Sequence, residues 1–170
     1  MLWAIIVAVL FALDQITKTY VKNNLPLGQS NEVIQDFFYF THVENTGAAF
    51  GILKNGRYFF IILTIIISFV LIYVMIKNKS KILRLAISIV LGGALGNFID
   101  RLLYGKVTDF LDFYIFGYDY PVFNVADICV NIGTILLAIY IIFIYKEPNN
   151  EEAEESNEPL SSETGDGLNE

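Results

Sequence analysis

Four aspartates in apolar surroundings are the side chains of this sequence best suited to chemistry: Asp100, Asp109, Asp112 and Asp127. Two carboxyl groups held a few ångströms apart do not both ionise readily, so one pKa rises and the pair shares a proton. Such a pair supplies a general base and a general acid together, because the charged member activates water while the protonated member polarises a carbonyl. This is aspartic-peptidase chemistry, which needs no metal ion. Spacing alone does not show which two of these acids meet.

Other hydrolytic chemistries lack their residues. The chain has one cysteine, Cys129, and one histidine, His42, so it has no intramolecular disulfide and too few ligands for an ordinary zinc site. It contains neither the HExxH motif of zinc peptidases nor a GxSxG motif. We interpret His42 as a loop or interface residue, and we expect no metal and no cofactor.

Polar side chains also interrupt the apolar stretches that surround these acids. Asp14 and Lys18 are four residues apart, on one face of a helix, and the long Lys18 side chain can reach toward the membrane surface. Ionisable residues inside a membrane span are functional candidates, but this pair can equally serve to pack the helix. Asn97 and Asp100 share one helix face with Gly93, and Asp100 needs a partner from Arg101 or from another span.

A second polar stripe begins at Asn124. Asn124 is a plausible helix N-cap with Asp127 at the capping-box position, so Asp127 can be explained as a capping acid alone. Asn131 and Thr134 continue the stripe deeper into the helix, and capping does not account for them. The stripe therefore predicts a polar lining inside one end of a helix bundle.

Four apolar segments must position these residues, at roughly residues 2–21, 58–76, 82–103 and 125–145. Each can cross a hydrocarbon core of about 30 Å as a helix. The chain has 170 residues, of which 55% are hydrophobic, and its mean hydropathy is +0.53. These values favour an all-α membrane protein with a four-transmembrane-helix bundle over a soluble domain.

Charge predicts the orientation of the bundle. The link between the second and third spans carries Lys77, Lys79, Lys81 and Arg84, which marks the cytoplasmic side and places both termini there. The loops around residues 22–57 and 104–124 then lie outside. Aromatic and β-branched residues at 32–41 predict short strands at the membrane surface, in a small extracytoplasmic β-sheet from the first outer loop.

The net charge of −7 comes from the C-terminal segment. Residues 147–170 hold nine acids and no Lys or Arg, and without them 11 basic and nine acidic residues leave a charge of +2. We therefore divide the chain into a membrane domain, residues 1–146, and an acidic disordered tail, residues 147–170.

The motifs resemble those of one family, the bacterial lipoprotein signal peptidases, also called signal peptidase II. Five blocks match in order: DQITK at 14–18, NTGAAFG at 45–51, GGALGNFIDR at 92–101, VTDF at 107–110 and FNVAD at 123–127. One departure is Ile128, where the family often has Ser or Thr.

The resemblance implies a membrane aspartyl endopeptidase, in the bacterial cytoplasmic membrane, that cuts diacylglyceryl-modified prolipoproteins just before the lipidated cysteine. It places the catalytic pair on Asp109 and Asp127. It implies that Asn45 either binds the substrate backbone or holds a loop. Membrane lipid is an expected partner, nucleic acid is not, and we expect a monomer. The supporting or substrate-binding positions that it implies are Asp14, Lys18, Asn45, Gly47, Asn97, Asp100, Arg101 and Asn124.

Two other classes compete with this interpretation. A small transporter or channel would use the polar stripe as an ion path, and a purely structural membrane protein would use its acids only as helix clamps. The second span is almost wholly apolar and polarity gathers at one end, whereas a transporter is expected to be polar through its full depth. The pattern favours a one-sided site.

Overall fold

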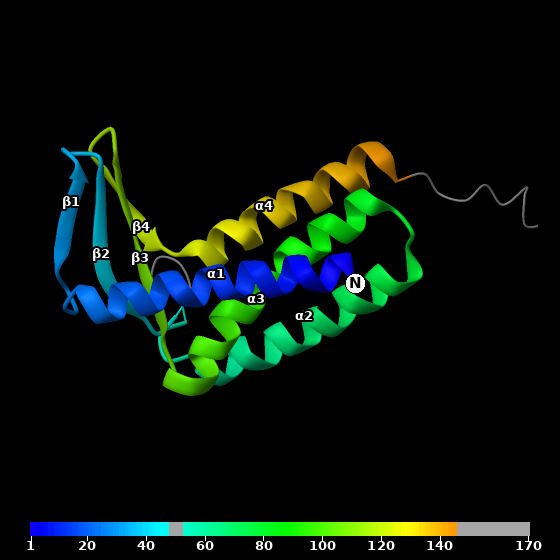
Figure 1. The fold of residues 1–170 in the computed structure, drawn as a ribbon, viewed down its shortest axis with the longest axis horizontal. Coiled ribbons are helices and arrows are strands. Elements are labelled where there is room, and N and C mark those ends of the chain that lie inside the picture. Colours follow the sequence, from blue (N-terminus) through cyan, green and yellow to red (C-terminus); the bar gives the residue numbers. More distant parts are fainter. Residues whose placement is uncertain (48–52, 146–170) are drawn as a thin grey trace, which may run out of the picture.

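Four membrane-spanning helices make up most of the computed structural model, which describes residues 1–47 and 53–145 (Figure 1). They are α1 (Leu2–Asn24), α2 (Arg57–Lys77), α3 (Lys81–Tyr104) and α4 (Val125–Ile139), which continues as the short π-helix η2 (Tyr140–Ile144). All four are long and apolar enough to cross a membrane. The predicted four-helix bundle is therefore confirmed. The predicted tail, residues 147–170, lies outside the described residues.

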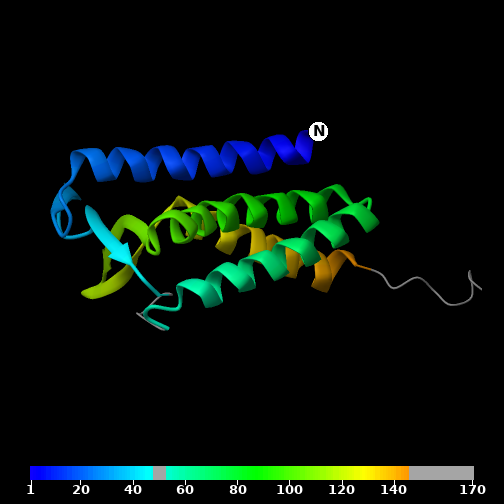
Figure 2. The ribbon, with the colours of Figure 1, turned by 90° about the horizontal axis from the view of Figure 1, so that it is seen from below.

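Helix α3 is the centre of the bundle, because its glycines let α1 and α4 approach it closely. A Cβ atom on Gly93 would lie 2.8 Å from Cys129 Cβ of α4. A Cβ atom on Gly92 would lie 2.8 Å from Leu10 Cβ of α1, and one on Gly96 would meet the Asp14 carboxylate. This is the close approach expected of a small-xxx-small pair. Figure 2 shows α3 lying between α1 and α2. Helix α2 has no buried residue, so it contributes a lipid-facing surface rather than part of the polar site.

A four-stranded antiparallel sheet closes one end of the bundle, in the order β1-β2-β3-β4. The predicted strands of the first loop are β1 (Ser30–Ile34) and β2 (Phe38–Asn45), and the second loop adds β3 (Val107–Ile115) and β4 (Tyr118–Phe123). The second pair was not predicted from the sequence. It changes the setting of Asp109, which lies on β3 opposite Val43 of β2 instead of in a loop.

The two ends of the molecule differ in character. The sheet lies where α1 ends and α4 begins, while Met1, the α2–α3 connection and the end of η2 lie at the opposite end (Figure 1). The basic link between the second and third helices is thus remote from the sheet. A small apolar cluster of Val21, Leu25 and Phe110 fixes β3 against the end of α1.

Candidate active site

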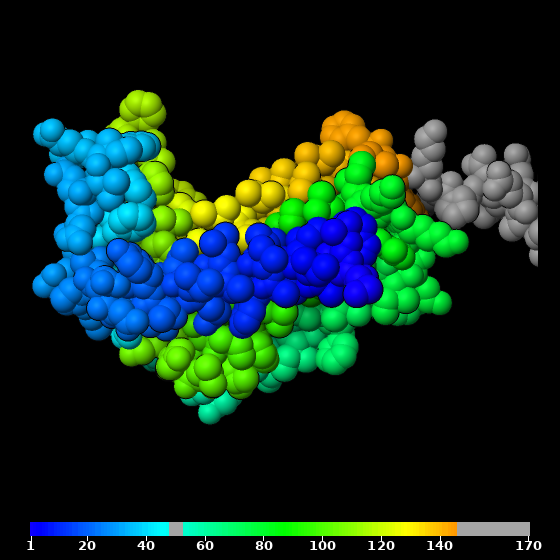
Figure 3. Space-filling view, viewed as in Figure 1, coloured from blue at the N-terminus to red at the C-terminus, as the bar shows by residue number. Residues whose placement is uncertain are grey.

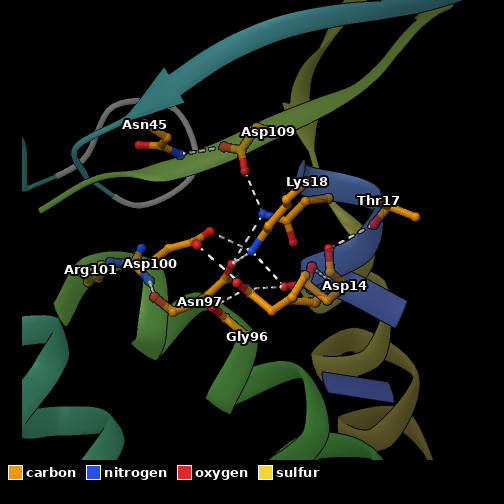
Figure 4. A network of polar contacts seen from close by, with 12 residues as sticks. Asp14, Thr17, Lys18, Asn45, Gly96, Asn97, Asp100, Arg101 and Asp109 are labelled. Atoms are coloured by element: carbon orange, nitrogen blue, oxygen red, sulfur yellow. Dashed lines mark hydrogen bonds and ion pairs between the residues drawn. The ribbon is translucent and has the colours of Figure 1, made fainter. Parts of the chain in front are cut away.

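A buried ion cluster joins α1 to α3 just below the sheet. Lys18 Nζ lies 2.8 Å from Asp14 Oδ2 and 2.9 Å from Asp100 Oδ2 (Figure 4). All three side chains are at most 1% exposed. The predicted pairing of Asp14 with Lys18 is confirmed, and the partner of Asp100 comes from another span. The prediction that Lys18 reaches toward the membrane surface is wrong, because two buried carboxylates hold its ammonium inside.

Asn97 connects this cluster to the next group of polar residues. Its Oδ1 accepts a hydrogen bond from Lys18 Nζ at 2.8 Å, and its Nδ2 donates to Asp127 Oδ1 at 2.8 Å. Because Lys18 can only donate, it fixes which end of the Asn97 amide faces Asp127. A charge in the core of the bundle thereby positions a hydrogen-bond donor at the sheet end.

Gln15 belongs to the same network, although its role was not predicted. Its Nε2 lies 3.2 Å from Asp14 Oδ2, 3.2 Å from the Gly96 carbonyl oxygen and 3.5 Å from Asp100 Oδ1. The sequence feature that could have indicated this role is the uncharged amide of Gln15 inside an otherwise apolar span. Gln15 lies between the Asp14 and Asp100 carboxylates, and its amide N–H groups give them hydrogen-bond donors in addition to the Lys18 ammonium.

Asp127 is held by the capping box at the start of α4. Asn124 Oδ1 accepts from the Asp127 backbone N–H at 3.0 Å, and Asp127 Oδ2 accepts from the Asn124 backbone N–H at 3.1 Å. This part of the prediction is confirmed. The N-terminal turn of a helix stabilises a carboxylate, and the Asn97 donor adds to that effect. Asp127 is half-buried, and its side chain lines an open cleft.

Asp109 has a different environment. It is 2% exposed, its Oδ2 accepts from Asn45 Nδ2 at 2.9 Å, and its Oδ1 accepts from Asn124 Nδ2 at 2.5 Å. Burial first, and the negative charge of Asp127 second, raise the pKa of Asp109 from 3.8 to about 7. Asn124 therefore contacts both acids.

Asn45 and Arg101 tie the first loop to this pair. Asn45 Oδ1 accepts from the Gly47 backbone N–H at 2.9 Å, while Arg101 Nη2 donates to the Gly47 carbonyl oxygen at 3.0 Å. The Arg101 guanidinium also lies 4.7 Å from the centre of the Phe60 ring. Asn45 thus holds both a turn and Asp109. Residues 48–51 of its motif lie outside the described residues.

Three of the polar residues singled out in the sequence lie away from the Asp109–Asp127 pair. Asp112, on β3, accepts from Thr41 Oγ1 at 2.5 Å and has no described contact with Asp109 or Asp127. Thr134 is exposed on α4, so the prediction that it continues the polar lining inside the bundle is wrong. His42 is buried with its Nδ1 2.8 Å from the Leu25 carbonyl oxygen, in agreement with a structural role.

A cleft of about 710 Å³ opens onto both acids, between the sheet and α4. Figure 3 shows the hollow between the β3–β4 hairpin and α4. Within the described ranges, no group of three His, Cys, Asp or Glu side chains could hold a metal ion. The polar lining is narrow and the remainder is aromatic and aliphatic. The polar residues that line it are Asn45, Asn97, Arg101, Asp109, Asp127 and Asn131, and the apolar ones include Phe37, Phe113, Tyr120, Val122, Phe123, Ile128 and Ile132.

Two aspartates that share a cleft at the end of a bundle of membrane-spanning helices are the arrangement expected of a membrane-bound aspartic peptidase. Residues 6–143 match the model of the signal peptidase (SPase) II family. The lipoprotein signal peptidase of Staphylococcus aureus (strain JH9) is 44% identical over 155 residues, which cover 89% of this chain and 93% of that protein. The chain therefore belongs to the lipoprotein signal peptidase II family, a family of aspartic peptidases.

Solved structures agree with this assignment. A bacterial membrane enzyme determined by the in meso method at 2.3 Å resolution is 43% identical and superposes with a TM-score of 0.79, covering 86% of this chain and 92% of that one. A second bacterial membrane enzyme structure, at 1.9 Å resolution, is 43% identical with a TM-score of 0.77 and covers 84% and 94% of the two chains.

Proposed function

We propose that the chain removes signal peptides from diacylglyceryl-modified prolipoproteins, cutting just before the lipidated cysteine, with Asp109 and Asp127 as the catalytic pair. One observation carries the assignment of the pair: of the acids singled out in the sequence, these two line the cleft together, and Asn124 hydrogen-bonds to both. Their environments differ, because burial and the charge of Asp127 raise the pKa of Asp109 to about 7, whereas Asp127 lies at a helix N-terminus and accepts hydrogen bonds from Asn97 and the Asn124 backbone.

The mechanism follows from that difference. Asp127, as the general base, accepts a proton from water as the water oxygen attacks the scissile carbonyl carbon, and Asp109, as the general acid, gives its proton to the carbonyl oxygen. As the tetrahedral intermediate collapses, one of its hydroxyl groups returns a proton to Asp109 and re-forms the carbonyl. The C–N bond breaks, and the leaving nitrogen takes the proton held by Asp127. Asn45 and Asn124 each donate a hydrogen bond to one Asp109 oxygen, and together these two bonds fix the plane of the carboxyl group.

The supporting residues act through these two acids. Lys18, Asp14 and Asp100 hold Asn97 in the orientation that donates to Asp127. Arg101 fixes the Gly47 carbonyl oxygen at the border of the cleft. One chain supplies both acids and the residues that position them, so the proposed reaction does not require a second copy.

The arrangement suits a lipid-bearing substrate. A diacylglyceryl group keeps the adjacent peptide bond at the membrane surface, and the cleft lies at the end of the spans beside the exposed apolar residues Ile128 and Ile132 of α4. The basic α2–α3 link lies at the opposite end. We therefore place the termini in the cytoplasm and the cleft at the outer face of the cytoplasmic membrane.

A cleavage assay tests the proposal directly. Wild type, Asp109→Asn, Asp127→Asn and Asp112→Asn are purified in detergent and given a diacylglyceryl-modified prolipoprotein beside its unlipidated form. Asp112 is the matched control, because it is a buried acid of the same strand that does not line the cleft. We expect the signal peptide to be lost only from the lipidated form, and only with wild type and Asp112→Asn.

The opposite results are equally clear. Near-normal turnover by folded Asp109→Asn or Asp127→Asn would remove that residue from the catalytic pair. A folded wild-type protein that cuts neither form would overturn the proposed reaction and restore the transporter interpretation.

A further inference from the structure

The turn between β3 and β4 presents an unusually exposed aromatic side chain. Phe116 and Gly117 form the two-residue loop of this hairpin, and Phe116 has a relative exposure of 106%. Its neighbours Ile115 and Tyr118 are 42% and 55% exposed. The hairpin thus ends in a group of apolar and aromatic side chains that no described part of the chain covers.

The backbone of this turn is at odds with its sequence. Phe116 has φ 51° and Gly117 has φ 81°, the positive values that a two-residue type I′ hairpin turn requires. Asn or Asp is the usual residue at the first of these positions, and a bulky aromatic residue there is strained. Since Phe116 neither favours the turn nor packs in the core, hairpin formation does not explain it.

The position of the hairpin supplies an explanation. It stands out sideways from the end of the bundle, on the side of α4, and overhangs the hollow beside that helix (Figures 1 and 3). The face of α4 next to the hollow exposes Ile128, Ile132 and Ile135, as expected of a lipid-facing span. The hairpin tip therefore continues a surface that already meets the membrane.

The charges of the hairpin agree with contact to lipid. Residues 114–118 carry no charged side chain, and Asp119 is the charged residue nearest the turn. Three exposed tyrosines lie close to the turn in the sequence: Tyr114, Tyr118 and Tyr120. Aromatic rings with a polar end concentrate at the membrane–water interface, where the ring meets lipid and the hydroxyl meets water.

We propose that the β3–β4 hairpin tip, residues 114–118, is an interfacial anchor that inserts the Phe116 side chain into the leaflet at the sheet end of the bundle. The occupant of this surface is phospholipid. Anchoring holds the edge strand β4 at the lipid surface, beside the cleft. This is the same depth in the membrane as the start of α4. Membrane contact of the tip does not depend on the proposed reaction.

Tryptophan fluorescence tests the depth of the tip. Trp3 is the only tryptophan, so Trp3→Phe gives a silent background for Phe116→Trp. Asn31→Trp in the same background is the matched control, because Asn31 is exposed on β1, the opposite edge of the sheet. Each full-length protein is reconstituted at low protein-to-lipid ratio in phosphatidylcholine–phosphatidylglycerol vesicles, with or without phospholipid brominated near the headgroup.

We expect brominated lipid to reduce the Phe116→Trp emission by about half and to leave Asn31→Trp nearly unchanged. Aqueous acrylamide should quench Asn31→Trp the more strongly of the two. Tyr118→Trp provides a second probe of the same tip if Phe116→Trp does not fold.

Three results would overturn the anchor. The first is emission from the tip that matches Asn31→Trp with both quenchers. The second is protection that appears only when the protein-to-lipid ratio is raised, which would make a second copy the occupant. The third is protection that appears only after prolipoprotein is added, which would make the substrate the occupant.

Discussion

The proton on Asp109 makes the stability of the fold depend on pH, and Asp109→Asn should remove that dependence. Burial and the charge of Asp127 raise the pKa of Asp109 from 3.8 to about 7 in the folded protein. In the unfolded chain the carboxyl group loses its proton near the ordinary value. Between these values the folded state holds a proton that the unfolded state has released, so the free energy of unfolding falls as pH rises.

The size of the effect follows from the interval covered. One pH unit in this window changes the free energy of unfolding by about 1.36 kcal/mol per proton. From about pH 5 to about pH 7 the Asp109 contribution is therefore about 2 kcal/mol, since half of the protons have left at the upper limit. For a chain of this length that corresponds to a fall in Tm of roughly 4–8 °C.

Thermal unfolding in detergent, followed by intrinsic fluorescence at constant ionic strength, measures this difference. Wild type and Asp112→Asn should both lose stability across the window. Asp109→Asn should not show the Asp109 part of that loss, because its amide does not titrate. An equal slope of Tm against pH in wild type and Asp109→Asn would refute the claim that Asp109 is protonated in the folded protein.

Other consequences of the site can be measured with the same preparations. The kcat/KM for a lipidated prolipoprotein should fall about tenfold per pH unit above about pH 7, as Asp109 loses the proton it donates, and a flat alkaline limb would contradict its role as the acid. Lys18→Met leaves two buried carboxylates unpaired and should cost about 3–5 kcal/mol, whereas the partly exposed Lys22→Met should cost less than about 1 kcal/mol; equal shifts in Tm would disprove the buried ion cluster. Truncation after Lys146 should leave turnover in detergent unchanged, and a large fall would assign the acidic tail a role. EDTA should have no effect, and inactivation that added metal reverses would contradict the metal-free mechanism.

The parts of the site that the sequence predicted are local in the chain. The capping box of Asn124 and Asp127 spans three residues, and the Asp14–Lys18 pair spans four, so helix geometry alone brings each pair together. The four spans were predicted equally well, because the thickness of a bilayer fixes both their length and their composition.

Contacts between segments that are distant in the sequence could not be predicted from local helix geometry. Asn97 reaches Asp127 only because α3 and α4 pack together, and Asn45 reaches Asp109 only because β2 pairs with β3. The alternation of polar and apolar residues around Asp109 was visible, but strand pairing across more than 60 residues was not. The burial of Lys18 likewise depended on Asp100, a partner on another helix.

The pair within α1 has a consequence for how the chain enters the membrane. The N-terminal span leaves the ribosome before α3 has been made, so Lys18 and Asp14 must first meet lipid without Asp100. Because they lie one turn apart on the same helix, the segment can enter the bilayer with no net charge at this level. When α3 inserts, Asp100 can pair with the Lys18 ammonium, which is already buried in the bilayer. The ion pair of the first span therefore acts as a docking point for the third, and couples the order of synthesis to the assembly of the site.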